Sequence, residues 1–541
     1  MANWPDSTLY EGFSDVADEY ADDIALRFDS ETTTYSELRA DSVALARGLS
    51  DLGVSEGETI AVWLANRPSW ITAQLAASFL GASIVAVNTR YRTHELEYML
   101  DDSDATTIIL EDEFLGKDYL GMLAEVVPEI DGSAPSEIES PDLPALEHVV
   151  SVSGGSEYEA VRSLDDVVER GRDASSPSEP ASTPEASACV FYTSGTTGEP
   201  KGCLQPNVGL LNHCHQAGVH LGVTNDDVAL GALPFCGVFG YGTLFAALLH
   251  GATVVPQTHF DAGTAIGLIE DHDVTYLSAI ELIASRIVDH DDFEPQRVSS
   301  LERGAITFHT PDPEVIGDLE EALGFPIVQP YGLSEANSQV FVGDPSDSFE
   351  QRVKVGGPMI HPEEEVEIVD LSTGEPVPDG EPGEICLRGL NVMSGYLGKP
   401  EATEEALDAD GWLHTGDIGV IDPETGYVYF RSRIDDALKI RGFLVDPSEI
   451  DRVLMRNAGV EEAAVVGAEH DQHGTLPVAF VVRSDESVTE DALLEYCADS
   501  IADYKVPHIV EFMDELPRTT GPHTPKVEKH KLRDRAKDLL G

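Results

Sequence analysis

The chain has 541 residues, 42% of them hydrophobic and 24% charged, so it is long enough for two or more domains and too apolar for a globally disordered protein. Asp and Glu total 99 against 33 Lys and Arg, which gives a formal net charge of −66. Such a surface repels nucleic acid phosphates, which argues against a DNA- or RNA-binding role.

The acidic residues are spread along the whole chain and do not form a tail. This composition resembles that of proteins from salt-accumulating halophiles, in which high salt screens the repulsion between like charges. We therefore expect halophilic behaviour and interpret the charge as an adaptation to the solvent. Because lysine is scarce, each lysine is a candidate for a specific role; the lysines stand at 117, 201, 354, 399, 439, 505, 526, 529, 531 and 537.

The cysteine spacing and the N-terminal sequence indicate the cellular compartment in which the protein is expected. None of the six cysteines forms a C-x-x-C pair, so neither a zinc site nor a disulfide framework is predicted. The N-terminus has no basic segment before an apolar run, and the most apolar stretch, 71–87, is interrupted by polar residues and glycine. We expect a cytoplasmic protein with reduced cysteines and no integral membrane association. The sequence does not indicate the oligomeric state, and a homodimer stays open.

Short apolar runs alternate with helical patterns along the first part of the chain. Strands are expected at 59–64, 82–87 and 105–110, with helices at 69–81 and 94–102 between them. This alternation is typical of βαβ units around a parallel sheet, and it recurs at 275–280 and 314–332. Residues 131–187 are rich in Ser, Pro, Glu and Asp and are expected to form a surface excursion.

The pattern changes near Ile434, where a small α+β segment of about a hundred residues begins. We therefore predict an α/β fold with a large N-terminal domain at 1–433 and a small α+β domain at 434–541.

Residues 192–202, YTSGTTGEPKG, combine hydroxyls, glycines and a lysine in one short segment. Glycines let backbone N–H groups converge on an anion, hydroxyls donate to phosphate oxygens, and lysine supplies a positive charge. The segment is not a Walker A loop, because Pro200 precedes Lys201 and Gly202 follows it. The composition alone also fits a flexible hairpin.

The whole string resembles the signature of the acyl-adenylate-forming superfamily, which includes acyl- and aryl-CoA synthetases, peptide-synthetase adenylation domains and beetle luciferases. In that superfamily the loop wraps the β- and γ-phosphates of ATP. The resemblance implies a catalytic role for Thr193 as well. The implied ATP-binding residues of the loop are Thr193, Ser194, Gly195, Thr196, Thr197, Gly198 and Lys201.

Two further segments resemble superfamily motifs in the expected order. QPYGLSE, 329–335, resembles the Y-G-x-T-E segment. The resemblance makes Tyr331 the ring that stacks on adenine, and it makes Gly332 and Ser334 nucleotide contacts. It makes Glu335 a catalytic carboxylate that holds Mg²⁺. GWLHTGD, 411–417, resembles the W-x-x-T-G-D motif, with Asp417 on the ribose hydroxyls. Both follow the order of the family, as do GEICLRG at 383–389 and MSGYL at 393–397.

The C-terminal motifs imply a domain that moves. RIDD, 433–436, resembles the family hinge, with Arg433 on the ribose and Asp435 absorbing the rotation. The segment that follows resembles the loop presented to the thiol acceptor, and it contains Lys439, Arg441 and Gly442. Near the end, Lys526 matches the catalytic lysine between the carboxylate and the α-phosphate. The resemblance makes 434–541 mobile and 1–433 the ATP- and acyl-binding domain.

The sequence departs from the family pattern at three places. Gly237, followed by Val238, stands where a histidine often borders the acyl pocket. His309 lies in the strip that lines adenine and acyl group, where it could supply a donor or simply pack. Pro525 stands where glycine usually precedes the catalytic lysine, which weakens the assignment of Lys526.

The resemblance implies an AMP-forming ligase that uses ATP, Mg²⁺ and coenzyme A to convert a carboxylic acid, fatty or aryl, to its acyl-CoA through an acyl-AMP, with release of pyrophosphate. Segment 235–243 has no acidic residue to bind a substrate amine, which favours an apolar acid. Two alternatives remain open: an adenylation enzyme that loads a separate carrier protein, and a non-catalytic nucleotide-binding homologue.

Overall fold

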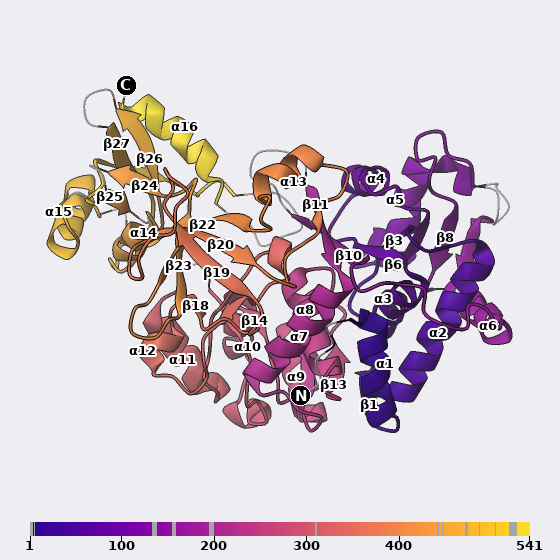
Figure 1. Cartoon of the computed structure of the whole chain (residues 1–541). Coiled ribbons are helices and arrows are strands. Elements are labelled where there is room, and N and C mark those ends of the chain that lie inside the picture. Colours follow the sequence, from indigo (N-terminus) through magenta and orange to yellow (C-terminus); the bar gives the residue numbers. More distant parts are fainter. Residues whose placement is uncertain are drawn as a thin grey trace. The chain divides into compact units, whose positions relative to one another are not determined.

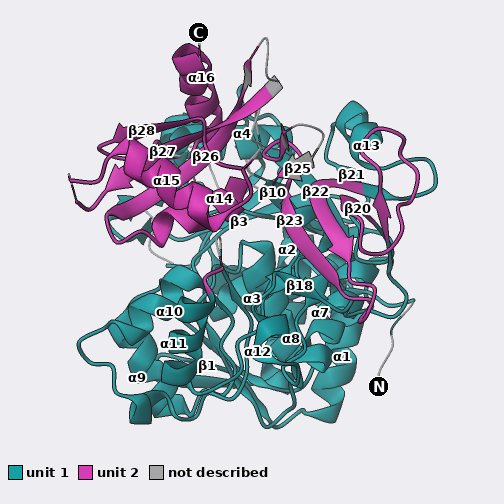
Figure 2. Cartoon of the chain, turned by 90° about the vertical axis from the view of Figure 1, so that its left-hand side faces the viewer, with its two compact units in different colours: residues 1–308, 313–366, 387–413 teal, residues 309–312, 367–386, 414–541 magenta. Residues whose placement is uncertain are grey.

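The computed structural model describes residues 4, 6–131, 138–153, 158–193, 200–308, 311–440, 443–445, 447–470, 474–485, 487–503, 505–518 and 527–540. The chain forms two compact units (Figure 2). Unit 1 comprises 1–308, 313–366 and 387–413, and unit 2 comprises 309–312, 367–386 and 414–541. Within the described ranges, no helix is both long and apolar enough to cross a membrane.

Unit 1 holds most of the helices and strands (Figure 1). Its α-helices are α1 (Leu9–Glu19), α2 (Tyr35–Leu52), α3 (Pro68–Leu80), α4 (Thr93–Asp102), α5 (Tyr119–Val126), α6 (Leu164–Asp173), α7 (Asn207–Leu221), α8 (Val238–Leu248), α9 (Ala262–His272), α10 (Glu281–Val288), α11 (Pro313–Leu323), α12 (Phe349–Arg352) and α13 (Pro400–Ala406). Its 3₁₀ turns are η1 (Pro128–Ile130), η2 (Pro295–Val298) and η3 (Ser334–Ala336).

The strands of unit 1 are β1 (Ile24–Phe28), β2 (Glu31–Thr34), β3 (Thr59–Trp63), β4 (Ser83–Ala86), β5 (Thr107–Leu110), β6 (Glu113–Phe114), β7 (Lys117–Asp118), β8 (His148–Ser151), β9 (Val161–Ser163), β10 (Ser187–Thr193), β11 (Lys201–Pro206), β12 (Val228–Gly231), β13 (Thr253–Pro256), β14 (Ala279–Ile280), β15 (Ile306–Thr307), β16 (Pro330–Tyr331), β17 (Phe341–Val342), β18 (Gly356–Gly357) and β21 (Gly395–Tyr396).

An eight-stranded sheet in the order β21-β11-β10-β4-β3-β5-β8-β9 forms the centre of unit 1. The six strands from β10 to β9 run parallel, whereas β11 pairs antiparallel with β10, and β21 pairs antiparallel with β11 at the edge of the sheet. Strands β3 and β5 are buried along almost their whole length, which explains why their sequences are near-continuous apolar runs. The α/β fold class is thus confirmed, including the predicted strand–helix alternation from β3 to β5.

Residues 131–187 depart from the expected surface excursion. Strand β8 is fully buried in the central sheet, and β9 pairs with it. The apolar run at β8 is only a few residues long within a polar segment, so periodicity did not reveal it.

Unit 2 contains two separate groups of strands. Strands β23 (Val428–Arg433), β22 (Leu413–Ile421), β20 (Gly383–Arg388) and β19 (Glu365–Val369) lie side by side in this order. The second group is the three-stranded sheet β26 (Val460–His470), β27 (Gly474–Arg483) and β28 (Ile509–Met513), accompanied by the hairpin β24 (Leu438–Ile440) and β25 (Phe443–Val445) and by α14 (Pro447–Met455), α15 (Glu490–Ser500) and α16 (Lys529–Leu540).

The two compact units are groups of residues that contact one another. The boundary predicted at 433–435 instead separates a fixed domain from a mobile one. Unit 2 takes in 367–386 and 414–433 together with the segment that follows them. A boundary for motion at Arg433–Asp435 therefore stays a prediction.

Helices α2 and α6 pack at a distance that two glycines permit. A Cβ on Gly48 would lie 2.0 Å from the carbonyl oxygen of Val167, and one on Gly171 would lie 1.7 Å from that of Ala44. These are backbone atoms, which cannot rotate away as a side chain can. The close approach therefore depends on glycine at both positions.

Gly48→Ala should destabilise unit 1 by about 1–3 kcal/mol, because α2 and α6 must separate to admit the methyl group. Gly267→Ala is the matched control: Gly267 also lies within a helix, α9, but a Cβ there meets no atom within 4 Å. The control should leave stability unchanged or raise it by up to about 1 kcal/mol, since alanine is the better helix former. Thermal unfolding of both variants measures the difference, and equal effects would contradict the packing argument.

Candidate active site

The predicted phosphate loop connects two paired strands. Strands β10 and β11 are antiparallel, with Thr193 opposite Lys201, and the Thr193 hydroxyl donates to the Lys201 carbonyl at 3.4 Å. The predictions for Ser194, Gly195, Thr196, Thr197 and Gly198 lie outside the described residues. The structure therefore places the first and last members of the predicted phosphate site at the two stems of one hairpin.

Two residues of α4 hold the two stems of this hairpin. Asp102, at the end of α4, accepts from the Tyr192 hydroxyl at 2.8 Å and from Lys399 Nζ at 2.6 Å. The Tyr98 hydroxyl donates to the Pro200 carbonyl at 2.7 Å, which fixes the chain just before β11. Hydrogen bonding to Asp102 raises the pKa of Lys399, so this lysine stays charged. Tyr192 and Pro200 belong to the string at 192–202, and Lys399 is one of the few lysines of the chain, whereas Tyr98 and Asp102 carried no site signal in the sequence.

Tyr331 and Glu335 lie on a segment whose path requires glycine. A Cβ on Gly332 would come within 2.4 Å of Gln339 N, so only glycine lets the backbone of 337–339 approach this closely. The Tyr331 ring stacks on Phe341, with ring centroids 5.6 Å apart. Ser334 begins the turn η3, and its carbonyl accepts from the Gln205 amide on β11.

Lys201 and Glu335 meet at a residue that sequence reasoning did not single out. The Tyr396 hydroxyl donates to Glu335 Oε1 at 2.8 Å, and Lys201 Nζ lies 4.5 Å from the centre of the Tyr396 ring. The only sequence signal for Tyr396 was its place in the MSGYL segment. The structure thus brings together two predicted ATP-site residues of unit 1.

Asp417 and Arg433, the two predicted ribose contacts, lie opposite one another on β22 and β23 of unit 2. Arg433 Nη1 is 3.0 Å from Asp417 Oδ1, and the Asp417 side chain is 6% exposed whereas that of Arg433 is 48% exposed. Thr415 supports this part of β22: its hydroxyl donates to the Ile385 carbonyl at 2.8 Å and accepts from Asp417 N at 3.1 Å. The pairing gives a buried carboxylate whose partner reaches solvent.

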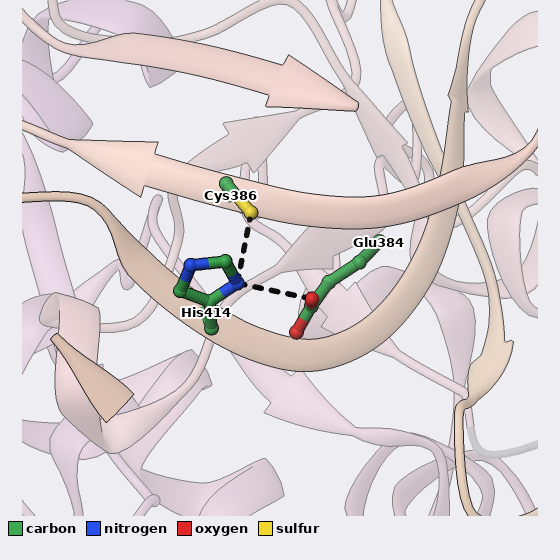
Figure 3. A group of neighbouring side chains, drawn as sticks. All are labelled: Glu384, Cys386 and His414. Atoms are coloured by element: carbon green, nitrogen blue, oxygen red, sulfur yellow. Dashed lines mark hydrogen bonds and ion pairs between the residues drawn. The ribbon is translucent and has the colours of Figure 1, made fainter. Parts of the chain in front are cut away.

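Glu384 and Cys386 of β20 gather with His414 of β22 (Figure 3). His414 Nδ1 lies 3.1 Å from Glu384 Oε2 and 3.5 Å from Cys386 Sγ, and Glu384 Oε1 accepts from Gly416 N at 3.0 Å. Carboxylate, thiol and imidazole could together hold a metal ion. Both oxygens of Glu384 are nevertheless engaged within the fold, so hydrogen bonding accounts for the cluster. Gly416 has φ +68°, a left-handed conformation that favours glycine, and Glu384 holds the amide of that residue.

The predicted hinge is held by the last helix. Arg533 on α16 donates to the Asp435 carbonyl at 2.7 Å and also contacts the Asp436 carboxylate. The predicted loop that follows is described only in part: Lys439 lies on β24, and Arg441 and Gly442 lie outside the described residues, as does Lys526.

The predicted acyl pocket is described at Gly237 and Val238, and His309 lies outside the described residues. Gly237 caps α8, and a Cβ there would meet only the Pro234 carbonyl, at 3.5 Å. The backbone at this position therefore has room for a side chain that the sequence does not supply.

Known proteins are similar to this chain over most of its length. Residues 13–397 match the family model described as AMP-binding enzyme, and residues 449–521 match the AMP-binding enzyme C-terminal domain. The putative acyl-CoA synthetase YngI of Bacillus subtilis (strain 168) is 31% identical over 100% of this chain and 99% of its own length. The 4-coumarate–CoA ligase 5 of Oryza sativa subsp. japonica is 32% identical over 90% of this chain and 87% of its own length.

A solved structure is similar over the whole chain. The O-succinylbenzoate coenzyme A synthetase (MenE) of Bacillus subtilis, in complex with ATP and magnesium ion, is 28% identical, covers 98% of this chain and 100% of its own, and superposes with a TM-score of 0.77.

Glu384→Ala should destabilise unit 2 by about 1–3 kcal/mol, because the Gly416 amide and His414 lose a largely buried acceptor. Glu365→Ala is the matched control, since Glu365 pairs with Arg388 but its side chain is 55% exposed. An exposed pair contributes at most about 1 kcal/mol. Chemical denaturation of the two variants measures both effects, and a loss in the control as large as in Glu384→Ala would contradict the assigned role.

Proposed function

The chain belongs to the AMP-binding enzyme family, and on that premise we propose that it joins a carboxylic acid to coenzyme A through an acyl-AMP intermediate, consuming ATP and releasing pyrophosphate and AMP. The observation that carries the proposal is the convergence of Lys201 and Glu335 beside the stems of the predicted phosphate loop. A cation for phosphate oxygens and a carboxylate for a hard metal ion are the two charges that bound ATP requires.

Glu335 fits the role of a magnesium ligand. Its Oε1 accepts from Tyr396, and Oε2 has no hydrogen-bond or ion-pair partner in the described ranges. A carboxylate oxygen that is oriented from one side and unengaged on the other suits Mg²⁺, which prefers oxygen ligands. When bound, the ion would neutralise part of the triphosphate charge.

The chemistry places few demands on the protein, because the substrate carboxylate is itself the nucleophile that attacks the α-phosphate. The barrier is largely charge repulsion and positioning. We assign Lys201 and the hydroxyls of the loop to the leaving pyrophosphate, Asp417 and Arg433 to the ribose, and Tyr331 to the adenine. Lys526 would orient the carboxylate against the α-phosphate. A rotation at Asp435 would then present the segment that contains Lys439, Arg441 and Gly442 for attack by the thiol.

The acid is proposed to be fatty or aryl. The segment 235–243 carries no charged side chain that would hold an amine or a second carboxylate near the acyl position. The open position at Gly237, with Val238 beside it, leaves room for a bulky acyl group. The relatives named above act, by their names, on a coumarate and a succinylbenzoate, which are both aryl acids.

A cytoplasmic location is also proposed. It is supported by the six cysteines, none of which forms a disulfide, and five of which are buried.

The wild-type chain should release pyrophosphate when ATP, Mg²⁺ and a fatty or aryl acid are supplied, and it should form acyl-CoA when CoA is added. Lys526→Ala should lower the rate of acyl-AMP formation about 10²–10³-fold, as expected for loss of a charge-stabilising contact. The same variant should still convert supplied acyl-AMP and CoA to thioester, because the lysine is needed only at the α-phosphate.

Lys529→Ala is the control for Lys526→Ala, since Lys529 is a neighbouring lysine whose Nζ lies 3.9 Å from Asp451 Oδ2. Adenylation should survive in this variant. Loss of adenylation in Lys529→Ala but not in Lys526→Ala would transfer the catalytic role to Lys529.

Pyrophosphate release by the wild-type chain without any acyl-CoA would instead support loading of a separate carrier protein. No pyrophosphate release with any acid would support a non-catalytic homologue.

We further propose that the chain is halophilic. With a net charge of −66, repulsion between carboxylates opposes the compact state, and it weakens as the screening length falls. The melting temperature should therefore rise with KCl into the molar range. Sucrose at matched osmolality is the control, because it favours compact states without screening charge. A melting temperature that is highest in dilute buffer, or that rises equally in sucrose, would contradict the proposal.

A further inference from the structure

The segment that contains Tyr396 is tied to both sides of the proposed ATP site. Strand β21 pairs antiparallel with β11, which places Tyr396 opposite Cys203. The Leu397 amide donates to the Gly202 carbonyl at 2.8 Å, and the Met393 amide donates to the Glu335 carbonyl at 2.8 Å. The backbone of this segment is thus fixed to the strand that begins at Lys201 and to Glu335 itself.

Strand register determines where the Tyr396 side chain lies. Alternate residues of a strand share a face, so Lys201 and Cys203 point to the same side of β11. Tyr396, opposite Cys203, is a diagonal neighbour of Lys201 on that side, which is within reach of a long side chain. The result is the observed 4.5 Å between Lys201 Nζ and the centre of the Tyr396 ring.

The other end of the same side chain engages Glu335. The Tyr396 residue is 8% exposed, and its hydroxyl donates to Glu335 Oε1 at 2.8 Å. Lys201 forms no ion pair with any carboxylate in the part of the chain that the structure describes. Lys201 and Glu335 carry opposite charges, and each contacts the tyrosine between them.

We propose that Tyr396 is a positioning residue that keeps Lys201 and Glu335 from pairing with each other, so that both charges remain available to the nucleotide and its metal ion. The aromatic face attracts the ammonium group without neutralising it, and the hydroxyl fixes one carboxylate oxygen and leaves the other for the metal. This role rests on the proposed function, because it assigns Lys201 and Glu335 to bound ATP and Mg²⁺.

Two substitutions separate the two contacts. Tyr396→Phe keeps the ring beneath Lys201 and removes the hydrogen bond to Glu335. Tyr396→Leu removes both contacts and leaves Lys201 and Glu335 free to pair. The role therefore predicts that the first variant weakens metal binding alone, whereas the second weakens binding of both metal and nucleotide.

The measurement is equilibrium binding, without acid or turnover. Mn²⁺ is titrated by electron paramagnetic resonance in the presence of α,β-methylene-ATP, and the metal-free analogue is titrated by calorimetry. Tyr396→Phe should raise the Mn²⁺ dissociation constant about 10-fold, as expected for loss of a hydrogen bond to a charged group, and leave metal-free nucleotide binding unchanged. Tyr396→Leu should weaken both titrations.

Tyr35→Phe is the matched control, because Tyr35 is fully buried and its hydroxyl donates to the Ala252 carbonyl, just before β13, at 2.7 Å. It should lower the melting temperature and leave both titrations unchanged. If the folded Tyr396 variants bind metal and nucleotide as the wild type does, Tyr396 only fills space and the inference is overturned. A wild-type chain that binds neither Mn²⁺ nor the analogue would instead overturn the proposed function itself, and the role of Tyr396 with it.

Discussion

The pairing of β10 with β11 is the contact on which the candidate site of unit 1 depends. It sets Thr193 opposite Lys201 at the ends of the predicted phosphate loop, and it gives β21 an edge to join. Because neighbouring residues of a strand face opposite sides, a slip of one residue between β11 and β21 would turn Lys201 away from Tyr396. The hydrogen bonds of Asp102 to Tyr192 and Lys399 add to the ladder in resisting such a slip.

Lys399 and Lys201 are two positive charges of this region whose surroundings differ. Lys399 lies 2.6 Å from Asp102, and the two charges offset one another at a partly buried position. Lys201 lies against an aromatic ring, which stabilises the ammonium group and leaves its net charge in place. The first arrangement suits a structural anchor, and the second suits a group that must meet phosphate oxygens.

Carboxylates in unit 2 are divided in a similar way. Glu384 is occupied on both oxygens by His414 and Gly416, so it fixes the backbone at the start of β22. Asp417, further along β22, is buried but faces Arg433, whose side chain is half exposed. Glu384 thus fixes the backbone, whereas Asp417, the proposed ligand-binding carboxylate, has a partner that reaches solvent.

The sequence alone determined the fold class, because strand and helix periodicities are local. It also proposed the candidate site, because the loop at 192–202 and the segments 329–335 and 411–417 carry their residue types in short strings. Strand β8 was not predicted, because its apolar run is too short to show a strand periodicity.

Only the tertiary structure determined which distant residues contact the side chains of those short segments. Tyr396 meets Lys201 and Glu335, and Asp102 meets Lys399, through strand pairings and contacts between residues far apart in the chain. A single sequence carries no record of strand register between distant segments, since the pairing is set by backbone hydrogen bonds and by the burial that the whole sheet achieves together.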